Sequence, residues 1–476
     1  MDLQGRAAQL FGNFTALRMP EINLSFEEYN NQSLQIANIL KQQGLRRGDI
    51  VAVVSPNSPE LVLLLAGVLK AGMIAAPLNN RFPEHLLNAT LDNLQPQLVL
   101  SDTAKKFLLT GIKTETVASI IEKATSCPVR EDFELPEPME RPVSIIHTSA
   151  STGMAKAAVH SLANHWYSAL GSNENIPFGA GDCWLLSLPL YHIGGYSLLF
   201  RSLISGGSLA LGKSDESLGQ SLQNFPLTHL SVVPTQLYRL LADNKSTALM
   251  QAMKAVLLGG SSAPKSLIEE AVLQHIPLYL SYGSTEMSSQ IATTPAPIVG
   301  IQETSGRLLP WRELKVSQDG ELLVKGACLF QGYLREGKIE PQTDNCGWFH
   351  TSDIGTVTDD GSVTVAGRKD NMFISGGENI HPEEIETALM MIDGVLEALV
   401  VPVNEDEYGQ RPVAFIKTVE ENKPDEITIT KAMGSMVGKL KSPTHYSRVK
   451  EWATLPGSQK IDRGFYKKLS LLPPDA

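Results

Sequence analysis

The amino-acid sequence predicts an α/β fold: a large N-terminal domain of parallel α/β sheets with a small β-barrel-like subdomain, followed by a small α+β C-terminal domain. Residues 26–102 alternate helical segments with short apolar runs, and the same alternation returns over residues 143–281. From about residue 300, Gly, Asp and short alternating runs dominate, and after Arg368 the pattern is mixed. Helix–strand alternation is typical of a parallel sheet covered by helices, whereas short alternating runs indicate antiparallel strands.

The first elements follow from apolar periodicity and from capping residues. Apolar residues at helical spacing over 26–43 predict a helix that stops at Gly44, and the run 49–55 predicts a strand. Ser58 and Pro59 supply an N-cap and a first-turn proline for a helix that extends to Lys70. A strand over 73–78, a helix over 85–94 and a strand over 98–101 complete this region.

The second region begins with a strand over 143–147, a loop rich in Ser and Thr, and a helix from about Ala163. Further strands are expected over 185–188, 230–233, 255–258 and 278–281. The runs 321–325, 355–358 and 362–365 predict a small antiparallel barrel or sheet within about 300–369. We therefore expect one domain over residues 1–369 and a second over residues 370–476.

Composition narrows the class of protein. The chain has 476 residues, which fits two or three domains, and a net charge of -11, which argues against a broad nucleic-acid surface. Its four cysteines show no metal-site spacing, so we expect reduced thiols and a cytoplasmic protein. The N-terminus lacks a signal-peptide pattern, and the apolar stretch 61–78 is interrupted by Lys70 and Gly72, so we expect no membrane insertion.

The strongest local signal is the segment from His147 to Ala157, which follows a strand directly. It contains small hydroxylated residues, a glycine and Lys156. Backbone N–H groups and hydroxyls can donate hydrogen bonds to phosphates there, and the lysine adds positive charge. It is not the common GxxxxGK[ST] loop, and taken alone it could equally be a flexible loop between core elements.

Three further segments offer groups for a nucleotide. Tyr282-Gly-Ser-Thr-Glu286 follows a strand end, where Thr285 can bind a phosphate and Glu286 can hold Mg²⁺. Asp353 suits ribose hydroxyls, and Arg368 suits phosphate or ribose oxygens. Each of these signals is weak alone, because a single charged side chain is usually a solvated surface group.

Together and in this order, the motifs resemble those of the superfamily of acyl-CoA synthetases, stand-alone adenylation domains and firefly-type luciferases. The resemblance covers nearly the whole chain and includes Leu188-Pro-Leu-Tyr-His192, Gly347-Trp-Phe-His-Thr-Ser-Asp353, Gly367-Arg-Lys-Asp370 and Leu455-Pro-Gly-Ser-Gln-Lys-Ile-Asp-Arg463. The phosphate loop departs from the family's TSGSTGxPK pattern at Ala150 and Ala155. Its hydroxyls and Lys156 are retained, so we expect ATP binding to survive.

The resemblance implies the site residues and an ATP-dependent acyl-adenylate mechanism with ATP, Mg²⁺ and coenzyme A. It implies Lys460, Thr285, Glu286 and Arg368 as catalytic residues, with Glu286 on the metal, and a mobile C-terminal domain hinged at Asp370. The nucleotide and coenzyme A residues it implies are Thr148, Ser149, Ser151, Thr152, Gly153, Lys156, Gly259, Gly260, Ser261, Ser281, Tyr282, Gly283, Asp353, Gly376 and Gly377. Gly376 and Gly377 would line the pantetheine channel, although a Gly-Gly hairpin turn explains them as well.

The acid is less constrained by the motifs. Candidate acid-binding residues are His192, Arg201, Thr235 and Tyr282. Arg201 lies in an apolar helical stretch, where a charge is costly unless paired, so it could anchor a second carboxylate or make an ion pair within the protein. Four stretches, 184–190, 233–237, 255–260 and 373–378, look like those of the o-succinylbenzoate–CoA ligases of bacterial menaquinone biosynthesis.

The resemblance therefore implies activation of o-succinylbenzoate and its transfer to coenzyme A. Two alternatives stay open: another aryl- or short-chain acyl-CoA ligase, and a catalytically silent nucleotide-binding protein. A homodimer is expected only by analogy with the family.

Overall fold

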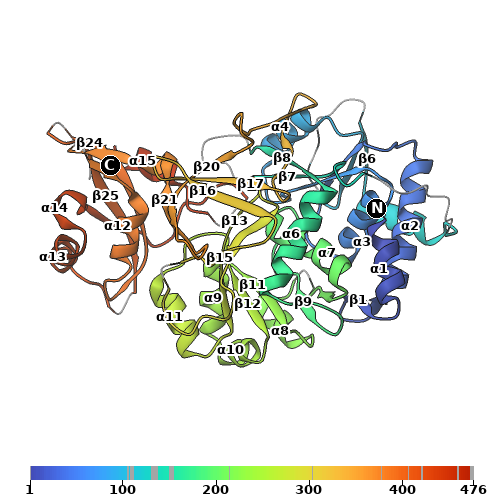
Figure 1. Cartoon of the computed structure of the whole chain (residues 1–476), viewed down its shortest axis with the longest axis horizontal. Coiled ribbons are helices and arrows are strands. Elements are labelled where there is room, and N and C mark those ends of the chain that lie inside the picture. The colour runs from blue at the N-terminus through green and yellow to red at the C-terminus, as the bar shows by residue number, and fades with distance from the viewer. Residues whose placement is uncertain are drawn as a thin grey trace.

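The computed structural model describes residues 2–103, 105, 107, 112–129, 138–148, 155–213, 215–302, 304–376, 378–405, 407–419, 422–457 and 460–471. Within these residues, two large sheets and a four-stranded sheet form the N-terminal region, and two small sheets follow Asp370 (Figure 1). This arrangement confirms the predicted fold class. No helix in the described part is long and apolar enough to cross a membrane.

The nine-stranded sheet carries Ser281, Tyr282 and Gly283 on β13, and the loop after its strand β12 contains Gly259, Gly260 and Ser261. Its central strands are parallel, and β14, β15 and β2 join antiparallel at the edges. In spatial order it contains β15 (Arg307–Leu308), β14 (Ser289–Thr293), β13 (Leu278–Ser284), β12 (Ala255–Leu258), β11 (His229–Val232), β9 (Cys183–Leu185), β10 (Ser208–Ala210), β1 (Thr15–Arg18) and β2 (Asn23–Ser25).

The eight-stranded sheet carries the ends of the phosphate loop. Its parallel half matches the predicted alternation, while β8, β18 and β19 add antiparallel strands. In order it contains β19 (Lys338–Glu340), β18 (Gly332–Arg335), β8 (Ala157–Ser161), β7 (Pro142–His147), β4 (Ile74–Leu78), β3 (Ile50–Val54), β5 (Leu98–Ser101) and β6 (Lys113–Glu115).

The third sheet of the N-terminal region is antiparallel and lies between the large sheets and the C-terminal region (Figure 1). It contains β16 (Arg312–Val316), β17 (Glu321–Gly326), β20 (Phe349–Val357) and β21 (Val363–Arg368). A short 3-10 turn, η1 (Lys369–Asn371), follows β21 and contains Asp370.

Helices cover both large sheets. In the N-terminal region they are α1 (Leu3–Phe11), α2 (Phe26–Gln42), α3 (Pro59–Lys70), α4 (Glu84–Leu94), α5 (Val117–Thr125), α6 (Leu162–Asn175), α7 (Ile193–Ser205), α8 (Leu218–Gln223), α9 (Pro234–Leu241), α10 (Asn244–Gln251) and α11 (Lys265–Leu273). As the sequence predicted, Ser58 caps α3 by accepting a hydrogen bond from the Leu61 N–H, and Pro59 occupies its first turn.

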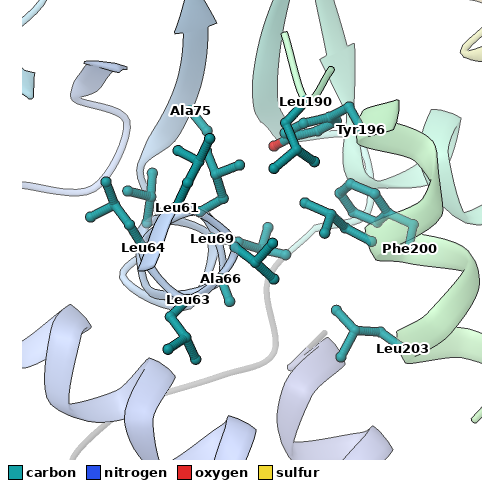
Figure 2. Packing of buried hydrophobic residues seen from close by; sticks show 14 of the residues in the cluster. Leu61, Leu63, Leu64, Ala66, Leu69, Ala75, Leu190, Tyr196, Phe200 and Leu203 are labelled. Atoms are coloured by element: carbon teal, nitrogen blue, oxygen red, sulfur yellow. The ribbon is translucent and has the colours of Figure 1, made fainter. Parts of the chain in front are cut away.

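Helices α3 and α7 pack against each other in the largest apolar cluster (Figure 2). Leu69 of α3 lies in this cluster with Phe200 and Leu203 of α7. Every residue of α7 from Gly195 to Ile204 is buried, because the helix is surrounded by packed elements. This burial fixes the helix that begins after His192 and contains Arg201.

The C-terminal region has its own apolar core. It contains β22 (Phe373–Ser375), β23 (Glu378–Ile380), α12 (Pro382–Leu389), β24 (Val395–Glu405), β25 (Gly409–Thr418), α13 (Glu426–Met436), α14 (Gly438–Lys441), β26 (Tyr446–Arg448) and α15 (Arg463–Leu469). The division of the chain at residues 369 and 370 remains a prediction.

Three details differ from the expectations. The strand expected over 185–188 ends at Leu185, because a turn closes there when Ser187 N–H donates to the Leu185 carbonyl. The phosphate segment joins two paired strands, since β8 returns antiparallel to β7. Residues 332–340, expected in the β-rich subdomain, pair with the eight-stranded sheet, where β18 continues the edge at β8.

Candidate active site

Strands from two sheets bring a tyrosine, an aspartate and an arginine together. Tyr282 of β13 donates its hydroxyl to Asp353 Oδ2 across 2.6 Å, and Arg368 Nη1 lies 3.0 Å from Asp353 Oδ1. Asp353 is positioned locally: its N–H donates to Thr351 Oγ1, and the preceding Ser352 has a φ of +59°. Burial raises the pKa of Asp353, although the Tyr282 and Arg368 hydrogen bonds oppose that change.

Arg368 links this cluster to the hinge candidate. Its other terminal nitrogen donates to Asp370 Oδ2 across 2.9 Å. Asp370 itself lies in η1, directly before the C-terminal region. Arg368 therefore contacts both the nucleotide candidate Asp353 and the hinge candidate.

Glu286 lies in the turn between β13 and β14, next to Thr285. Tyr333 of β18 donates its hydroxyl to Glu286 Oε1 across 2.6 Å. Glu286 Oε2 accepts no hydrogen bond from the described residues, so one carboxylate oxygen is available to a ligand. His160 of β8 holds the same turn, because its Nε2 lies 2.7 Å from the Thr285 carbonyl oxygen, which can only accept.

The phosphate segment is described only at its ends. Thr148 N–H donates to the Lys156 carbonyl across 2.9 Å, which closes the β7–β8 hairpin. The Lys156 ammonium lies 5.2 Å from the centre of the Tyr333 ring, so it is near Glu286 as well. Ser149, Ala150, Ser151, Thr152 and Gly153 lie outside the described residues.

The loop after β12 provides a glycine-rich surface. Gly260 has a φ of +87°, and a Cβ there would lie 3.2 Å from Val233 Cγ1. Gly259 N–H donates to the Val232 carbonyl, and Ser261 is exposed. On the neighbouring strand, Gly283 follows Ser281 and Tyr282, and its Cα hydrogen faces the Ser289 backbone so closely that a Cβ would clash.

Lys460 comes from the C-terminal region and reaches this cluster. The charges of Arg368, Glu286 and Asp353 all act on its ammonium, so Lys460 lies near these three side chains. Burial by the surrounding protein is the largest cause that lowers the Lys460 pKa, even though part of the residue is exposed. The structure thus brings Lys460, Glu286 and Arg368 near one another, and Thr285 directly precedes Glu286 in the turn after β13.

His192 borders the same region at the start of α7. Burial, with the charges of Lys460 and Arg81, lowers the His192 pKa to about 4, so its imidazole is neutral at pH 7. Thr235 lies in the first turn of α9 and is exposed. Both positions are compatible with an acid pocket between α7, α9 and β13.

Arg201 is only 5% exposed and has no carboxylate partner among the described residues. Its Nη2 donates to the amide oxygen of Gln290 across 2.6 Å, and its guanidinium lies 5.2 Å from the Trp184 ring. Among the described residues, its Nε has no hydrogen-bond partner. Burial and the nearby Arg312 lower the Arg201 pKa to about 9, so the side chain remains charged at pH 7.

A cavity of about 90 Å³ adjoins Arg201 on the α6 side and is also lined by Trp184 and Ser205. His192 and Tyr282, two of the acid-binding candidates, do not line it. The ion-paired alternative for Arg201 finds no support among the described residues, because its hydrogen-bond partner is a neutral amide.

Gly376, one of the two glycines assigned to coenzyme A, lies among residues of the C-terminal region rather than beside Lys460. Gly376 has a φ of +55° and turns between β22 and β23, as a hairpin glycine would. Its neighbours are Tyr408 and Leu440, both of the C-terminal region. Gly377 lies outside the described residues.

Sequence reasoning missed the side chains that hold the site from behind. Tyr333, His160 and Gln290 each contact a candidate residue or its backbone. No local pattern distinguishes them, because Tyr333 and His160 lie on one large sheet and contact a turn of the other, and Gln290 of β14 contacts Arg201 of helix α7. The one usable signal was the position of His160 shortly after the phosphate segment.

Comparison with known proteins gives the family. Residues 5–334 match the AMP-binding enzyme family and residues 384–458 match the AMP-binding enzyme C-terminal domain. The 2-succinylbenzoate–CoA ligase of Escherichia coli strain K12 is 34% identical over 467 residues, covering 97% of this chain and 96% of the relative.

Two solved structures of o-succinylbenzoate CoA synthetase (MenE) from Bacillus subtilis are also similar. One, in complex with the acyl-adenylate intermediate OSB-AMP, has a TM-score of 0.86 at 28% identity and covers 98% of each chain. The other, with ATP and a magnesium ion, has a TM-score of 0.84 at 28% identity, covering 97% of this chain and 98% of the other. The resemblance predicted from the motifs is confirmed, and the chain belongs to the family of AMP-binding enzymes.

Proposed function

We propose that this protein activates o-succinylbenzoate with ATP and then transfers the acyl group to coenzyme A, giving o-succinylbenzoyl-CoA, AMP and pyrophosphate. The observation that carries the proposal is that Lys460, from after the hinge, lies near enough to Glu286, Asp353 and Arg368, from before it, for their charges to act on its ammonium. Family membership and the similarity to 2-succinylbenzoate–CoA ligases support the same reaction.

In the first half-reaction, a carboxylate oxygen of the acid attacks the α-phosphorus of ATP, and the bond from that phosphorus to the bridging oxygen of pyrophosphate breaks. Both reactants are anions, so the transition state needs cations and donors around it. Lys460 supplies the central charge, and Lys156 and Thr285 face the phosphates. Loss of one such contact costs about 3–4 kcal/mol in comparable enzymes.

Glu286 is the residue that would hold Mg²⁺. Its free carboxylate oxygen fits a metal that is bound by one or two carboxylates and by substrate phosphates. No group of three or more His, Cys, Asp or Glu side chains in the described chain forms a dedicated metal cage, which agrees with that mode. The ion neutralises phosphate charge when bound.

Asp353 would receive the ribose hydroxyls, with its carboxylate held by Tyr282 and Arg368. In the second half-reaction the coenzyme A thiol attacks the acyl carbon and AMP leaves. Lys460 would withdraw as the C-terminal domain rotates at Asp370, bringing Gly376 and Gly377 toward the thiol. The position of Gly376 away from the Lys460 cluster supports two separate poses.

Arg201 would anchor the second carboxylate of the acid. It lies nine residues beyond His192, roughly 13 Å along the axis of α7, and helical side chains lean back toward the N-terminus. An unpaired buried cation gains most from an anionic ligand. An acid with two carboxylates is therefore favoured over a simple aryl acid, and the retained Lys460, Glu286, Asp353 and Arg368 disfavour a silent protein.

The first test is pyrophosphate release with ATP, Mg²⁺ and a panel of acids: o-succinylbenzoate, its two monomethyl esters, benzoate and short-chain fatty acids. We expect o-succinylbenzoate to give the highest kcat/KM. A higher kcat/KM with benzoate or a fatty acid would identify that acid as the substrate instead. If no acid supported pyrophosphate release, the protein would be a catalytically silent nucleotide-binding protein.

Two-pose catalysis is tested with Lys460→Ala. Adenylate formation should collapse, whereas thioester formation from supplied acyl-adenylate and coenzyme A should persist. An equal loss in both steps would refute domain alternation.

A cytoplasmic location and a homodimer are further proposals, the second by family analogy alone, and light scattering of the purified protein tests the dimer.

A further inference from the structure

Lys460 lies on a hairpin that is anchored firmly at its base. Thr454 and Ile461 pair across it, and Leu455 N–H donates to the Lys460 carbonyl across 2.9 Å. Directly after it, Arg463 bonds the Glu386 carboxylate at 2.8 Å within the C-terminal region. The base of the hairpin therefore moves with the C-terminal region.

The far end of the same hairpin contacts the N-terminal region. Asn79 Nδ2 donates to the Gly457 carbonyl across 2.6 Å, joining residues 378 positions apart in the chain. Gly457 has a φ of +71°, and a Cβ there would lie 2.7 Å from Phe82 Cδ1 and 2.8 Å from Asn79 Nδ2. The contact thus needs a residue without a side chain at position 457.

The Asn79 side chain is held in place by the N-terminal region itself. The residue is 6% exposed and follows β4 directly. Its Oδ1 accepts a hydrogen bond from the Arg81 N–H at 2.9 Å, which fixes the amide so that its NH₂ faces Gly457. Arg81 in turn lies near enough to His192 for its charge to lower the pKa of that histidine.

We propose that Asn79 is a positioning residue for adenylate formation: it docks Gly457 and thereby holds the Lys460 hairpin over the site in this pose only. The proposal rests on the proposed two-step function. Among the described contacts of Gly457, none holds the far end of the hairpin to the rest of the C-terminal region. Rotation of that region would separate Gly457 from Asn79, so the second half-reaction would proceed without this bond.

A purely structural role for Asn79 makes a different prediction. Its Oδ1 stabilises the 79–82 loop in both poses, so damage to that loop would slow both half-reactions. Asn79→Asp separates the two roles, because the aspartate keeps the acceptor for Arg81 N–H but loses the donor to Gly457. Gly457→Ala attacks the same contact from the other side.

The experiment measures both half-reactions in the full-length protein. Pyrophosphate release reports the first, and conversion of supplied acyl-adenylate and coenzyme A reports the second. Asn79→Asp and Gly457→Ala should each lower the first rate by about tenfold or more, as loss of a buried hydrogen bond and a steric clash would, and leave the second within about twofold. Asn80→Asp, which makes the same chemical change one residue along, is the matched control and should alter neither rate.

A combined variant gives the sharpest check. If Asn79 acts through Lys460, Asn79→Asp should cause no further loss of the first rate in the Lys460→Ala protein. Three results would overturn the proposal. Asn79→Asp could slow both half-reactions equally, or it could leave the first rate unchanged. The combined variant could also show additive losses. If the wild type is active only with another acid, the substrate proposal fails while the Asn79 test proceeds with that acid; if no acid supports release, both fail.

Discussion

Tyr333 donates its hydroxyl to Glu286 Oε1 across 2.6 Å, and the same ring lies 5.2 Å below the Lys156 ammonium. The hydrogen bond holds the carboxylate that we assign to Mg²⁺, and the ring face attracts the lysine that we assign to the phosphates. Burial is the first cause that raises the Tyr333 pKa, so the hydroxyl remains a donor at pH 7. One side chain of β18 therefore orients two charges of opposite sign.

Replacing Tyr333 with Phe tests this arrangement. Without the donor, the Glu286 carboxylate is no longer oriented, so we expect the Mg²⁺ concentration for half-maximal adenylate formation to rise by about threefold to tenfold. Titration of pyrophosphate release with Mg²⁺ measures it. Tyr279→Phe removes a hydroxyl from a buried tyrosine at the opposite end of β13 and is the control. An unchanged Mg²⁺ requirement in Tyr333→Phe would show that Tyr333 does not orient the Glu286 carboxylate.

The pH dependence of adenylate formation should report Lys460. Burial and the charge of Arg368 lower its pKa below the ordinary 10.5, while Glu286 and Asp353 act in the opposite direction. Lysine is active when protonated, so kcat/KM should fall as pH rises through this lowered value. Lys460→Arg should move the alkaline fall to higher pH, because arginine stays charged. An identical alkaline limb in that variant would assign the titration to another group.

Substitution of Arg201 by Leu should change selectivity between acids. Loss of a charged hydrogen bond to the second carboxylate should lower kcat/KM for o-succinylbenzoate by roughly 10- to 100-fold, and benzoate should lose little. The ratio of the two kcat/KM values measures the effect independently of the amount of folded protein. Arg201→Lys keeps the charge and should retain part of the selectivity; an unaltered ratio in Arg201→Leu would exclude the anchor.

Buried histidines should make the protein less stable in mild acid. Burial lowers the pKa values of His147 and His160 to about 4 from 6.5. Between these values the unfolded chain binds protons that the folded protein does not. The free energy of unfolding is therefore highest above about pH 6.5 and falls as the pH drops toward 4. The loss is up to about 3 kcal/mol per histidine.

Urea unfolding followed by circular dichroism at several values between pH 7.5 and pH 4.5 measures this loss. His160→Gln retains a donor for the Thr285 carbonyl but does not titrate, so its stability should depend less steeply on pH than that of the wild type. His275→Gln changes an exposed histidine and serves as the control. Equal slopes in all three proteins would show that His160 does not contribute.

Many helices and strands could be predicted from the sequence because the capping and apolar residues that form them lie within the same short segment. The helix from Pro59 to Lys70 carries its own cap and apolar face, and the strand Ala255–Leu258 is a short apolar run. The ordered motifs also identified the residues that gather around Lys460. The strand at Ala157–Ser161 was missed because its pairing with β7 depends on the hairpin that the phosphate segment closes.

The sequence by itself determined the α/β alternation, the nucleotide motifs and the family, since each depends on residues close together in the chain or on their order. Only the tertiary structure decided which side chains support the site: Tyr333 on Glu286, Gln290 on Arg201, and Asn79 on Gly457. These pairs are 47, 89 and 378 residues apart. Their contacts follow from strand order and from the docking of one region on another, which periodicity within a segment does not encode.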